Sequence, residues 1–488
     1  MRRRSLLAAL ASCVAALVLP ACAAAGRPLV RNERTGAIDW TPCGKIECGT
    51  LSVPLDYAHP RGRRITLALG RLPAAHQSIG ALFVNPGGPG GSGVDLVRDA
   101  AAEFPAEILA SFDVVSWDPR GLAGTPAVRC LGDLDPFYAV NRDSTGPAQV
   151  AENVAVSRAF VESCRKYSAP LLPYMSTAAS VRDLDSIRAA IGVPKISYLG
   201  FSYGTLIGAM YADTFPQHVR AMVLDGAVDP ARSYAETTIE QAQGFDDDLE
   251  AFFDHCRSDA KCAFARGGDP AAAYDDLART IAAEPVPATV DGEPRTLGPG
   301  EFAIGVASAL YAGPDGYDTL AAALAQAGSG IGSKLLALSD DYTGRTRGAN
   351  YSNETAAFYA TSCIDGPSPT SVAAVRALAD RAARAAPYFG ASNVWLGLPC
   401  TFWPAPVVGE VAPIRAPHAP PLVVVGTTKD PATPYPWAES LAAEMRSARL
   451  LTLEGTGHTA YGRNDCIDAN VDGYLLRLVM PAEGTTCG

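Results

Sequence analysis

The segment from Lys195 to Tyr211 constrains this chain more than any other. A short apolar run, Ile196 to Leu199, predicts a buried strand, and the small and apolar residues after Gly204 predict a helix packed closely on a sheet. Between them lies Gly-Phe-Ser-Tyr-Gly, a G-x-S-x-G sequence. A serine on such a sharp strand-to-helix turn is exposed as a nucleophile, and glycine on both sides leaves room for the turn. Ser202 is therefore the candidate nucleophile; a glycine-rich turn that merely contains a serine is the alternative.

Strand and helix patterns alternate around this turn. Four further apolar runs predict interior strands, at 81–85, 112–118, 219–225 and 421–426. Alternating strands and helices predict an α/β fold with a mostly parallel sheet and helices on both faces. Residues 230–415 show Ala-rich helical segments and no convincing interior strand, so they predict a helical cap inserted into the core. The expected division is a leader at 1–25, core at 26–229, cap at 230–415 and core again at 416–488.

The N-terminus has the pattern of a secretory signal. Three arginines follow Met1, an apolar stretch runs from Leu6 to Leu19, and small residues end the segment. The stretch is too short to predict a membrane-spanning helix. Leu19-Pro-Ala-Cys22 approximates a bacterial lipobox, which predicts a lipid on Cys22 and anchoring at the cell envelope. Ordinary cleavage after Ala23 or Ala25, giving a secreted protein, is the alternative.

Cysteine usage agrees with export. Of twelve cysteines, ten lie beyond Cys22, and an even number in an oxidising compartment favours disulfides. Sequence alone leaves the connectivity open. Pairing between neighbours is the hypothesis: Cys43–Cys48, Cys130–Cys164, Cys256–Cys262, Cys363–Cys400 and Cys466–Cys487. The spacing is not that of a zinc site, so neither a metal nor a cofactor is expected.

The charge balance limits the partners. The formal net charge is −11, and no basic stretch lies outside the leader. Nucleic-acid binding needs a basic surface, so the sequence argues against it.

A serine hydroxyl needs a base, and the base needs an orienting carboxylate. Of the six histidines, His458 alone follows a late strand, in a Gly-His-Thr loop. Asp430 follows the strand before it and is the expected acid, with Asp225 as the alternative. The chain order Ser202, Asp430, His458 is the order expected for a nucleophile of this kind.

Two backbone groups are expected to bind the oxyanion. One is the N–H of Tyr203, directly after the nucleophile, and the other should come from Gly88 in the glycine-rich loop after the 81–85 strand. A phosphate-binding loop is the rival interpretation of these glycines, but the Gly-Lys-Ser/Thr ending is absent.

These motifs together resemble a known family, the secreted tripeptidyl aminopeptidases among the prolyl-aminopeptidase-like α/β-hydrolases. The resemblance covers nearly the whole mature chain. Prolyl aminopeptidases usually begin the oxyanion loop with histidine; Pro86 stands there, as is usual in the tripeptidyl group. The motifs that carry it are Asn85-Pro-Gly-Gly-Pro-Gly-Gly-Ser-Gly93, Gly200-Phe-Ser-Tyr-Gly204, Thr428-Lys-Asp-Pro-Ala-Thr-Pro434, Gly457-His-Thr459, Trp40-Thr-Pro-Cys43 and Trp117-Asp-Pro-Arg-Gly121.

The resemblance implies an exported serine exopeptidase that releases short peptides, expected to be tripeptides, from free N-termini. It also implies a lid over the active site. A substrate ammonium group in a partly desolvated site needs a carboxylate partner. Glu236 and Glu240, one helical turn apart in the cap, are the first candidates, and Asp246, Asp247, Asp248 and Glu354 are the others. A secreted esterase or lipase, and a non-catalytic surface-binding protein of the same fold, are the alternative functions.

Overall fold

The computed structural model describes residues 38–122, 126–143, 146–264 and 268–488. The leader expected at 1–25 and the lipobox cysteine, Cys22, lie outside the described residues. Among the described residues, no helix combines the length and the apolar character needed to cross a membrane.

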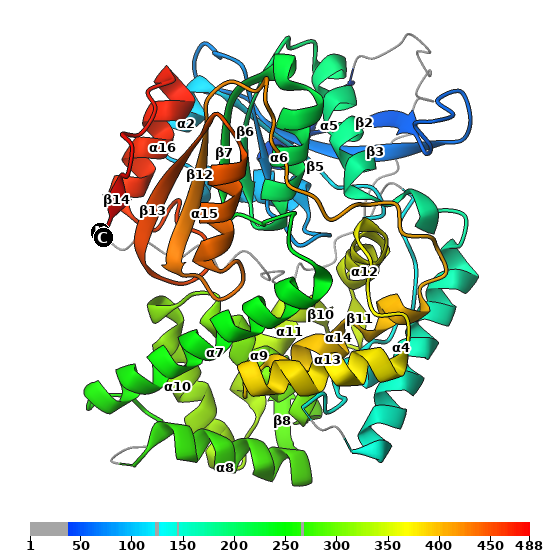
Figure 1. Cartoon of the computed structure of the whole chain (residues 1–488), viewed down its shortest axis with the longest axis vertical. Coiled ribbons are helices and arrows are strands. Elements are labelled where there is room, and N and C mark those ends of the chain that lie inside the picture. The colour runs from blue at the N-terminus through cyan, green and yellow to red at the C-terminus, as the bar shows by residue number, and fades with distance from the viewer. Residues whose placement is uncertain (1–37, 123–125, 144–145, 265–267) are drawn as a thin grey trace, which may run out of the picture.

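A single ten-stranded sheet forms the core, in the order β1-β2-β3-β5-β4-β6-β7-β12-β13-β14. The strands from β5 through β14 in this order are parallel, and β1 to β3 are antiparallel at one edge. The mostly parallel sheet is therefore confirmed (Figure 1). The strands are β1 (Thr41–Cys43), β2 (Ile46–Pro54), β3 (Arg64–Leu72), β4 (Ala81–Asn85), β5 (Asp113–Trp117), β6 (Ile196–Phe201), β7 (Val219–Asp225), β12 (Leu422–Lys429), β13 (Ala448–Thr456) and β14 (Thr486–Cys487).

Helices cover both faces because alternate residues of each central strand point to opposite sides. Tyr198 of β6 and Val424 of β12 join one apolar cluster, whereas their neighbours Leu199 and Val425 join the other. The first cluster includes residues of α5, α6 and α15, and the second includes residues of α1, α2 and α16. These helices are α1 (Gly93–Glu103), α2 (Ala106–Ser111), α5 (Thr177–Ile191), α6 (Tyr203–Thr214), α15 (Tyr435–Glu444) and α16 (Asp465–Arg477).

A helical block lies below the sheet in Figure 1 and follows β7 in the chain. It has an apolar core of its own, which includes Phe252, Leu310 and Leu324. Its elements are α7 (Tyr234–Ser258), α8 (Pro270–Ala283), α9 (Pro299–Leu310), α10 (Pro314–Gly328), α11 (Ser333–Thr343), α12 (Glu354–Asp365), α13 (Val372–Ala385), α14 (Gly390–Leu396) and the 3-10 helix η3 (Leu398–Phe402).

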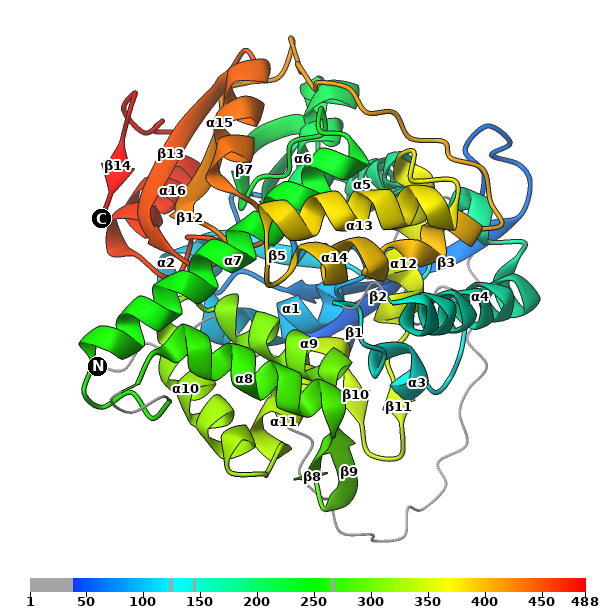
Figure 2. The same ribbon diagram turned by 60° about the horizontal axis from the view of Figure 1, so that its bottom comes forward.

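Two features of this block were not predicted. It contains the hairpins β8 (Val286–Val290) with β9 (Glu293–Leu297) and β10 (Arg345–Thr346) with β11 (Asn350–Tyr351), both separate from the main sheet. In addition, α3 (Asp135–Tyr138) and α4 (Pro147–Ser168), which precede the elbow in sequence, lie beside the block (Figure 2).

Hydrogen bonds join α3 to the block. The Tyr138 hydroxyl lies 2.7 Å from Thr355 Oγ1, and Arg345 donates to Asp135 at 2.6 Å. Two pieces of chain far apart in sequence therefore form one surface opposite the carboxyl ends of the parallel strands.

The described residues form five disulfides, and all five join the neighbours expected from the sequence. They are Cys43–Cys48, Cys130–Cys164, Cys256–Cys262, Cys363–Cys400 and Cys466–Cys487. Two of them tie helices of the block, since Cys363 lies in the last turn of α12 and Cys400 in η3, while Cys256 lies in the last turn of α7.

We expect these ten cysteines to be unreactive towards a thiol reagent in unfolded, unreduced protein. Losing one native disulfide costs about 2–5 kcal/mol in small secreted domains, because the unfolded chain regains freedom. Reduction should therefore lower the melting temperature measured by calorimetry. Titration of most of the ten as free thiols would contradict this expectation.

Candidate active site

The turn between β6 and α6 holds Ser202 in a backbone conformation that non-glycine residues rarely adopt, with φ 54° and ψ −126°. Close approach explains the flanking glycines. A Cβ on Gly200 would lie 2.5 Å from Gly204 O, and one on Gly204 would lie 2.7 Å from Asn85 Oδ1. The Ser202 amide donates to Asp225 O at 2.9 Å, which fixes the turn against β7.

Asp430 and His458 form the second part of the site. His458 Nδ1 lies 2.9 Å from Oδ1 and 3.0 Å from Oδ2 of Asp430, and both side chains are largely buried. Because the carboxylate engages Nδ1, it sets the tautomer that leaves Nε2 as the proton acceptor.

Several donors hold the Asp430 carboxylate in place. Oδ1 accepts the amides of Ala432 and Thr433, each at 2.9 Å. Oδ2 accepts the Thr433 hydroxyl at 3.0 Å and the Thr459 amide at 3.2 Å. The Asp-Pro-Ala-Thr sequence after β12 therefore forms a tight loop around the carboxylate, which leaves the acid little freedom to turn away from His458.

Asp225, the alternative acid, does not contact the His458 ring through a hydrogen bond in the described part of the chain. Its carboxylate accepts the amides of Ala460 and Tyr461 at 2.8–3.1 Å. Burial raises its pKa to about 6, and these amides oppose that shift. Asp225 therefore positions the loop that carries His458, whereas Asp430 orients its ring.

Gly226 lies beside the His458 ring and directly follows the residue that binds the Ser202 amide. A Cβ on this glycine would be 3.2 Å from His458 Cε1, and the residue before it accepts the Ser202 amide. The described residues show no hydrogen bond between Ser202 Oγ and His458. Such contacts often shorten only when substrate binds.

The expected oxyanion groups line the same cavity as the nucleophile. Ser202, Gly88 and Tyr203 all face a cavity of about 420 Å³ that lies between the sheet and the helical block. Tyr203 begins α6, so its N–H is one of the free donors at that helix end. Gly88 has φ +110°, a conformation that glycine adopts without strain. Both groups are therefore near the serine.

The two glutamates expected to bind an amine do not line this cavity. Glu236 forms a capping box with Ser233 at the start of α7. Glu240 accepts from Arg232 at 2.9 Å and from Trp437 Nε1 at 2.5 Å. Both carboxylates are thus engaged in holding α7 in place.

Two other carboxylates do line the cavity, Asp143 and Asp365. Sequence reasoning missed both. Asp143 lies in a stretch of weak periodicity before α4, and Asp365 ends α12, more than 160 residues from the elbow. No local pattern connects either residue with the nucleophile, because the fold alone brings them together.

Helix α7 packs directly on the loop that carries the acid (Figure 2). A Cβ on Gly244 would lie 2.7 Å from Pro431 O and 3.1 Å from Asp430 O. Gln241 of the same helix donates to Ala432 O at 2.8 Å. The helical block therefore contributes to the position of Asp430.

We expect Gly244→Ala to lower kcat/KM about 10²-fold, since a displacement near 1 Å in a catalytic group has effects of this size. Alanine favours a helix over glycine by about 1 kcal/mol, so lost helix stability would not explain the effect. The matched control is Gly328→Ala, where a Cβ would meet no atom within 4 Å. Equal activity of the two variants would show that the helix does not position the acid.

One group of side chains in the described residues has metal-ligand spacing. His255, Asp259 and Asp318 bring one ligand atom each within 4.8 Å of one another. None of the three lines the Ser202 cavity.

Comparisons with known proteins agree with this geometry. Residues 80–265 match the family model described as alpha/beta hydrolase fold, and residues 386–487 match the model described as TAP-like protein. A serine protease named Hip1 from Mycobacterium tuberculosis is 37% identical over 99% of this chain and 98% of its own length. A tripeptidyl aminopeptidase from Streptomyces lividans is 33% identical over 94% of this chain and 87% of its own.

Two further matches are proteins named neither Hip1 nor tripeptidyl aminopeptidase. A carboxylesterase B from Mycobacterium tuberculosis is 37% identical over 95% of this chain and 91% of its own length. A solved proline iminopeptidase structure from Mycobacterium smegmatis covers 84% of this chain and 91% of its own, at 14% identity and a TM-score of 0.37. The named peptidases match nearly the whole chain, and the expected family is thereby confirmed. The chain belongs to the α/β-hydrolase serine peptidases that include the tripeptidyl aminopeptidases.

Proposed function

We propose that this serine peptidase is an aminopeptidase that releases short peptides, with tripeptides as the main product, from free N-termini. The observation that supports this most is that the Ser202 cavity is also lined by a carboxylate, Asp143, from outside the nucleophile loop. One relative is named a tripeptidyl aminopeptidase, and this supports a product of three residues.

In the proposed mechanism, His458 Nε2 accepts the Ser202 proton while Ser202 Oγ attacks the scissile carbonyl carbon. The N–H groups of Tyr203 and Gly88 bind the resulting oxyanion. Asp430 stabilises the imidazolium and then His458 donates its proton to the leaving amine. Water, activated by the same imidazole, hydrolyses the acyl-enzyme and restores Ser202.

Asp143 is proposed to bind the substrate ammonium group. Of the two carboxylates, Asp143 lines only the catalytic cavity, whereas Asp365 also lines a second, adjoining cavity. The Asp143 side chain is exposed, the protein packed around its carboxyl group raises its pKa to about 6 by limiting hydration, and the Ser392 side chain favours the ionised form. The group is therefore ionised above pH 6, where it can hold an ammonium, and loses that ability as the pH falls below 6.

We expect Asp143→Asn to raise KM for a free-amine tripeptide amide by about 10- to 100-fold, the worth of one hydrogen bond to a charged group. The wild-type KM should rise as the pH falls through 6, and the variant should lose this dependence. Acetylating the substrate's amino group should raise KM by a similar factor in the wild type and should raise it little further in the variant.

Small activated esters without an amine serve as the control, since they report on Ser202 and His458 alone. Equal cleavage of acetylated and free peptides by the wild type would indicate an open cleft and would contradict the aminopeptidase proposal.

A carboxylic-ester hydrolase is the second candidate, favoured by the relative named carboxylesterase B. The same nucleophile and base cleave esters readily. Comparing kcat/KM for a tripeptide amide and for a short-chain fatty ester separates the two, because the peptidase proposal requires a marked preference for the peptide.

We also propose that the protein is exported, either secreted or lipid-anchored through Cys22. The basic and apolar N-terminal sequence and the five disulfides support this proposal. Radiolabelled fatty acid incorporation, lost in Cys22→Ala, would distinguish an anchored from a released protein.

A further inference from the structure

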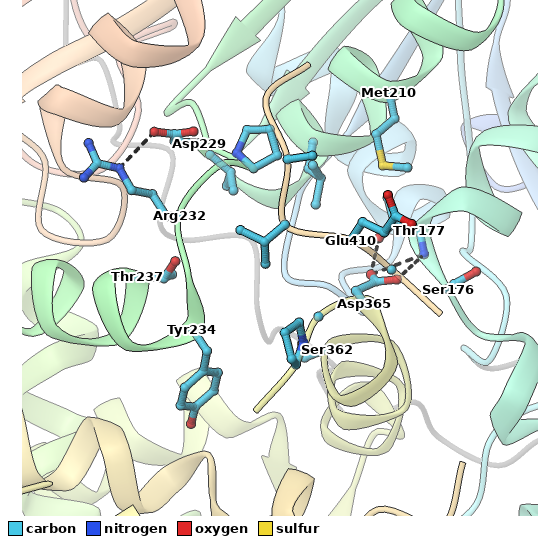
Figure 3. Close-up of a pocket in the computed structure, with 18 of the residues that line it drawn as sticks. Ser176, Thr177, Met210, Asp229, Arg232, Tyr234, Thr237, Ser362, Asp365 and Glu410 are labelled. Carbon is cyan, nitrogen blue, oxygen red and sulfur yellow. Dashed lines mark hydrogen bonds and ion pairs between the residues drawn. The ribbon is translucent and has the colours of Figure 1, made fainter. Parts of the chain in front are cut away.

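A second and larger cavity shares lining residues with the catalytic one; Figure 3 shows side chains that line this second cavity. Its volume is about 660 Å³, against about 420 Å³ for the cavity that contains Ser202. Nine residues line both cavities, among them Leu206, Gln241, Phe358 and Asp365. The two cavities therefore lie side by side, and we refer to the larger one as the outer chamber.

Residues 408–414 form one side of the outer chamber and are referred to as the strap. Three backbone hydrogen bonds to other described residues hold the strap. Val408 and Gly409 donate to Ile364 O at 2.8 and 3.0 Å, and Ala412 donates to Pro230 O at 3.2 Å. Gly409 lies so close to α12 that a Cβ there would be 2.0 Å from Asp365 O. An extended segment thus runs along the chamber and remains largely exposed.

Apolar side chains of the outer chamber remain accessible to solvent. Val408 and Val411 of the strap are 52% and 40% exposed, and Phe358 of α12 is 37% exposed. Met210 of α6 projects toward the same space (Figure 3). Exposed apolar surface that lines a groove is typical of a site that binds another chain.

Acidic groups also line the chamber. Among the described residues that line the chamber, four are carboxylates, Asp213, Asp229, Asp365 and Glu410, and one is a cation, Arg232, which donates to Asp229 at 2.9 Å. The excess of three negative charges, next to apolar walls, should concentrate cationic ligands, because a low-dielectric cleft focuses the field.

From these features we infer that the outer chamber binds the part of a polypeptide substrate that follows the cleaved bond, with a preference for lysine or arginine there. The inference rests on the proposed function. If Asp143 holds the amino terminus in the catalytic cavity, the rest of the chain must leave through a neighbouring space, and the outer chamber adjoins that cavity. Apolar contacts on the strap and α12 bind the chain, and the carboxylates select its charge.

The test uses three substrates with one free N-terminal tripeptide. The first ends in an aromatic amide, the second continues for six neutral residues, and the third continues for six residues that include two lysines. We expect kcat/KM to rise along this series, by about tenfold between the first and the third. The lysine effect should shrink between 0.1 and 1 M salt, as the screening length falls from about 10 to 3 Å.

Two variants locate the effect in the chamber. Ala412→Trp fills it and should bring the ratio of kcat/KM for the long and short substrates to about one. Glu410→Gln removes one charge and should reduce the preference for the lysine substrate over the neutral one. The matched controls are Ala482→Trp and Glu483→Gln, at exposed positions outside both cavities, and these should keep the wild-type ratios.

Any one of three results would overturn the inference. The first is an equal kcat/KM for short and long substrates in the wild type, and the second is a wild-type ratio of these values in Ala412→Trp. The third is a kcat/KM that rises when residues are added before the tripeptide. Failure of the proposed function is a separate result, because the short amide would then not be cleaved by any form of the protein.

Discussion

Ser202→Ala is expected to reduce kcat about 10⁶-fold, the loss found when a serine peptidase is deprived of its nucleophile. The strained backbone at φ 54° presents Oγ to the cavity, and the nearest substitute, water, lacks this orientation. His458→Ala should cost a similar amount, and the double variant should lose little more, since the two residues act as one unit.

Activity on the tripeptide amide gives the measurement, with Ser258→Ala at an exposed position on α7 as the control. Circular dichroism should show that Ser202→Ala remains folded, because the strain at position 202 does not depend on the hydroxyl. Near-normal turnover by Ser202→Ala would refute its role as nucleophile.

Asp430→Asn is expected to reduce kcat about 10⁴-fold. The asparagine amide would donate towards Nδ1 and so favour the tautomer with its proton on Nε2, which cannot accept the Ser202 proton. The Ala432 and Thr433 amides would still find an acceptor in the asparagine oxygen, whereas the Thr459 amide would lose Oδ2, so the loop should keep most of its shape. The defect should therefore lie in kcat, with KM changed little.

Asp225→Asn is the informative comparison, and Asp275→Asn, exposed on α8, is the neutral control. Within the part of the chain that the structure describes, the Asp225 carboxylate accepts two backbone amides and no hydrogen bond from the imidazole. Asp225→Asn should therefore lower the stability of the fold more than it changes the tautomer of His458. A larger kcat loss in Asp225→Asn than in Asp430→Asn would assign the acid to position 225.

The core of this fold was predictable because its signals are local. Buried parallel strands require continuous apolar runs, and the runs at 81–85 and 421–426 become β4 and β12. The elbow was also predictable, since Gly200 and Gly204 are required by contacts within a few residues or with the adjacent strand. β14 was missed because a two-residue edge strand carries no periodicity.

The carboxylates of the cavity were not predictable in the same way. Glu236 follows Ser233 by three residues, which is the capping-box pattern, and that local signal explains its side chain. Glu240 pairs with Arg232 and Trp437, a contact that depends on the docking of α7 against α15. Asp143 reaches the cavity because α3 and the segment after it lie beside the helical block, and no periodicity in that stretch signals this arrangement.

Mass spectrometry of the products from one unblocked peptide of about twelve residues tests the proposed function most directly. Samples taken over time should show the N-terminal tripeptide first and then the next one, with the remaining chain shortened by three residues at each step. The acetylated form of the same peptide should be cleaved about 10- to 100-fold more slowly at low substrate concentration, and Ser202→Ala should release nothing. Fragments from the interior of the peptide, or cleavage of both forms at equal rates, would contradict an aminopeptidase.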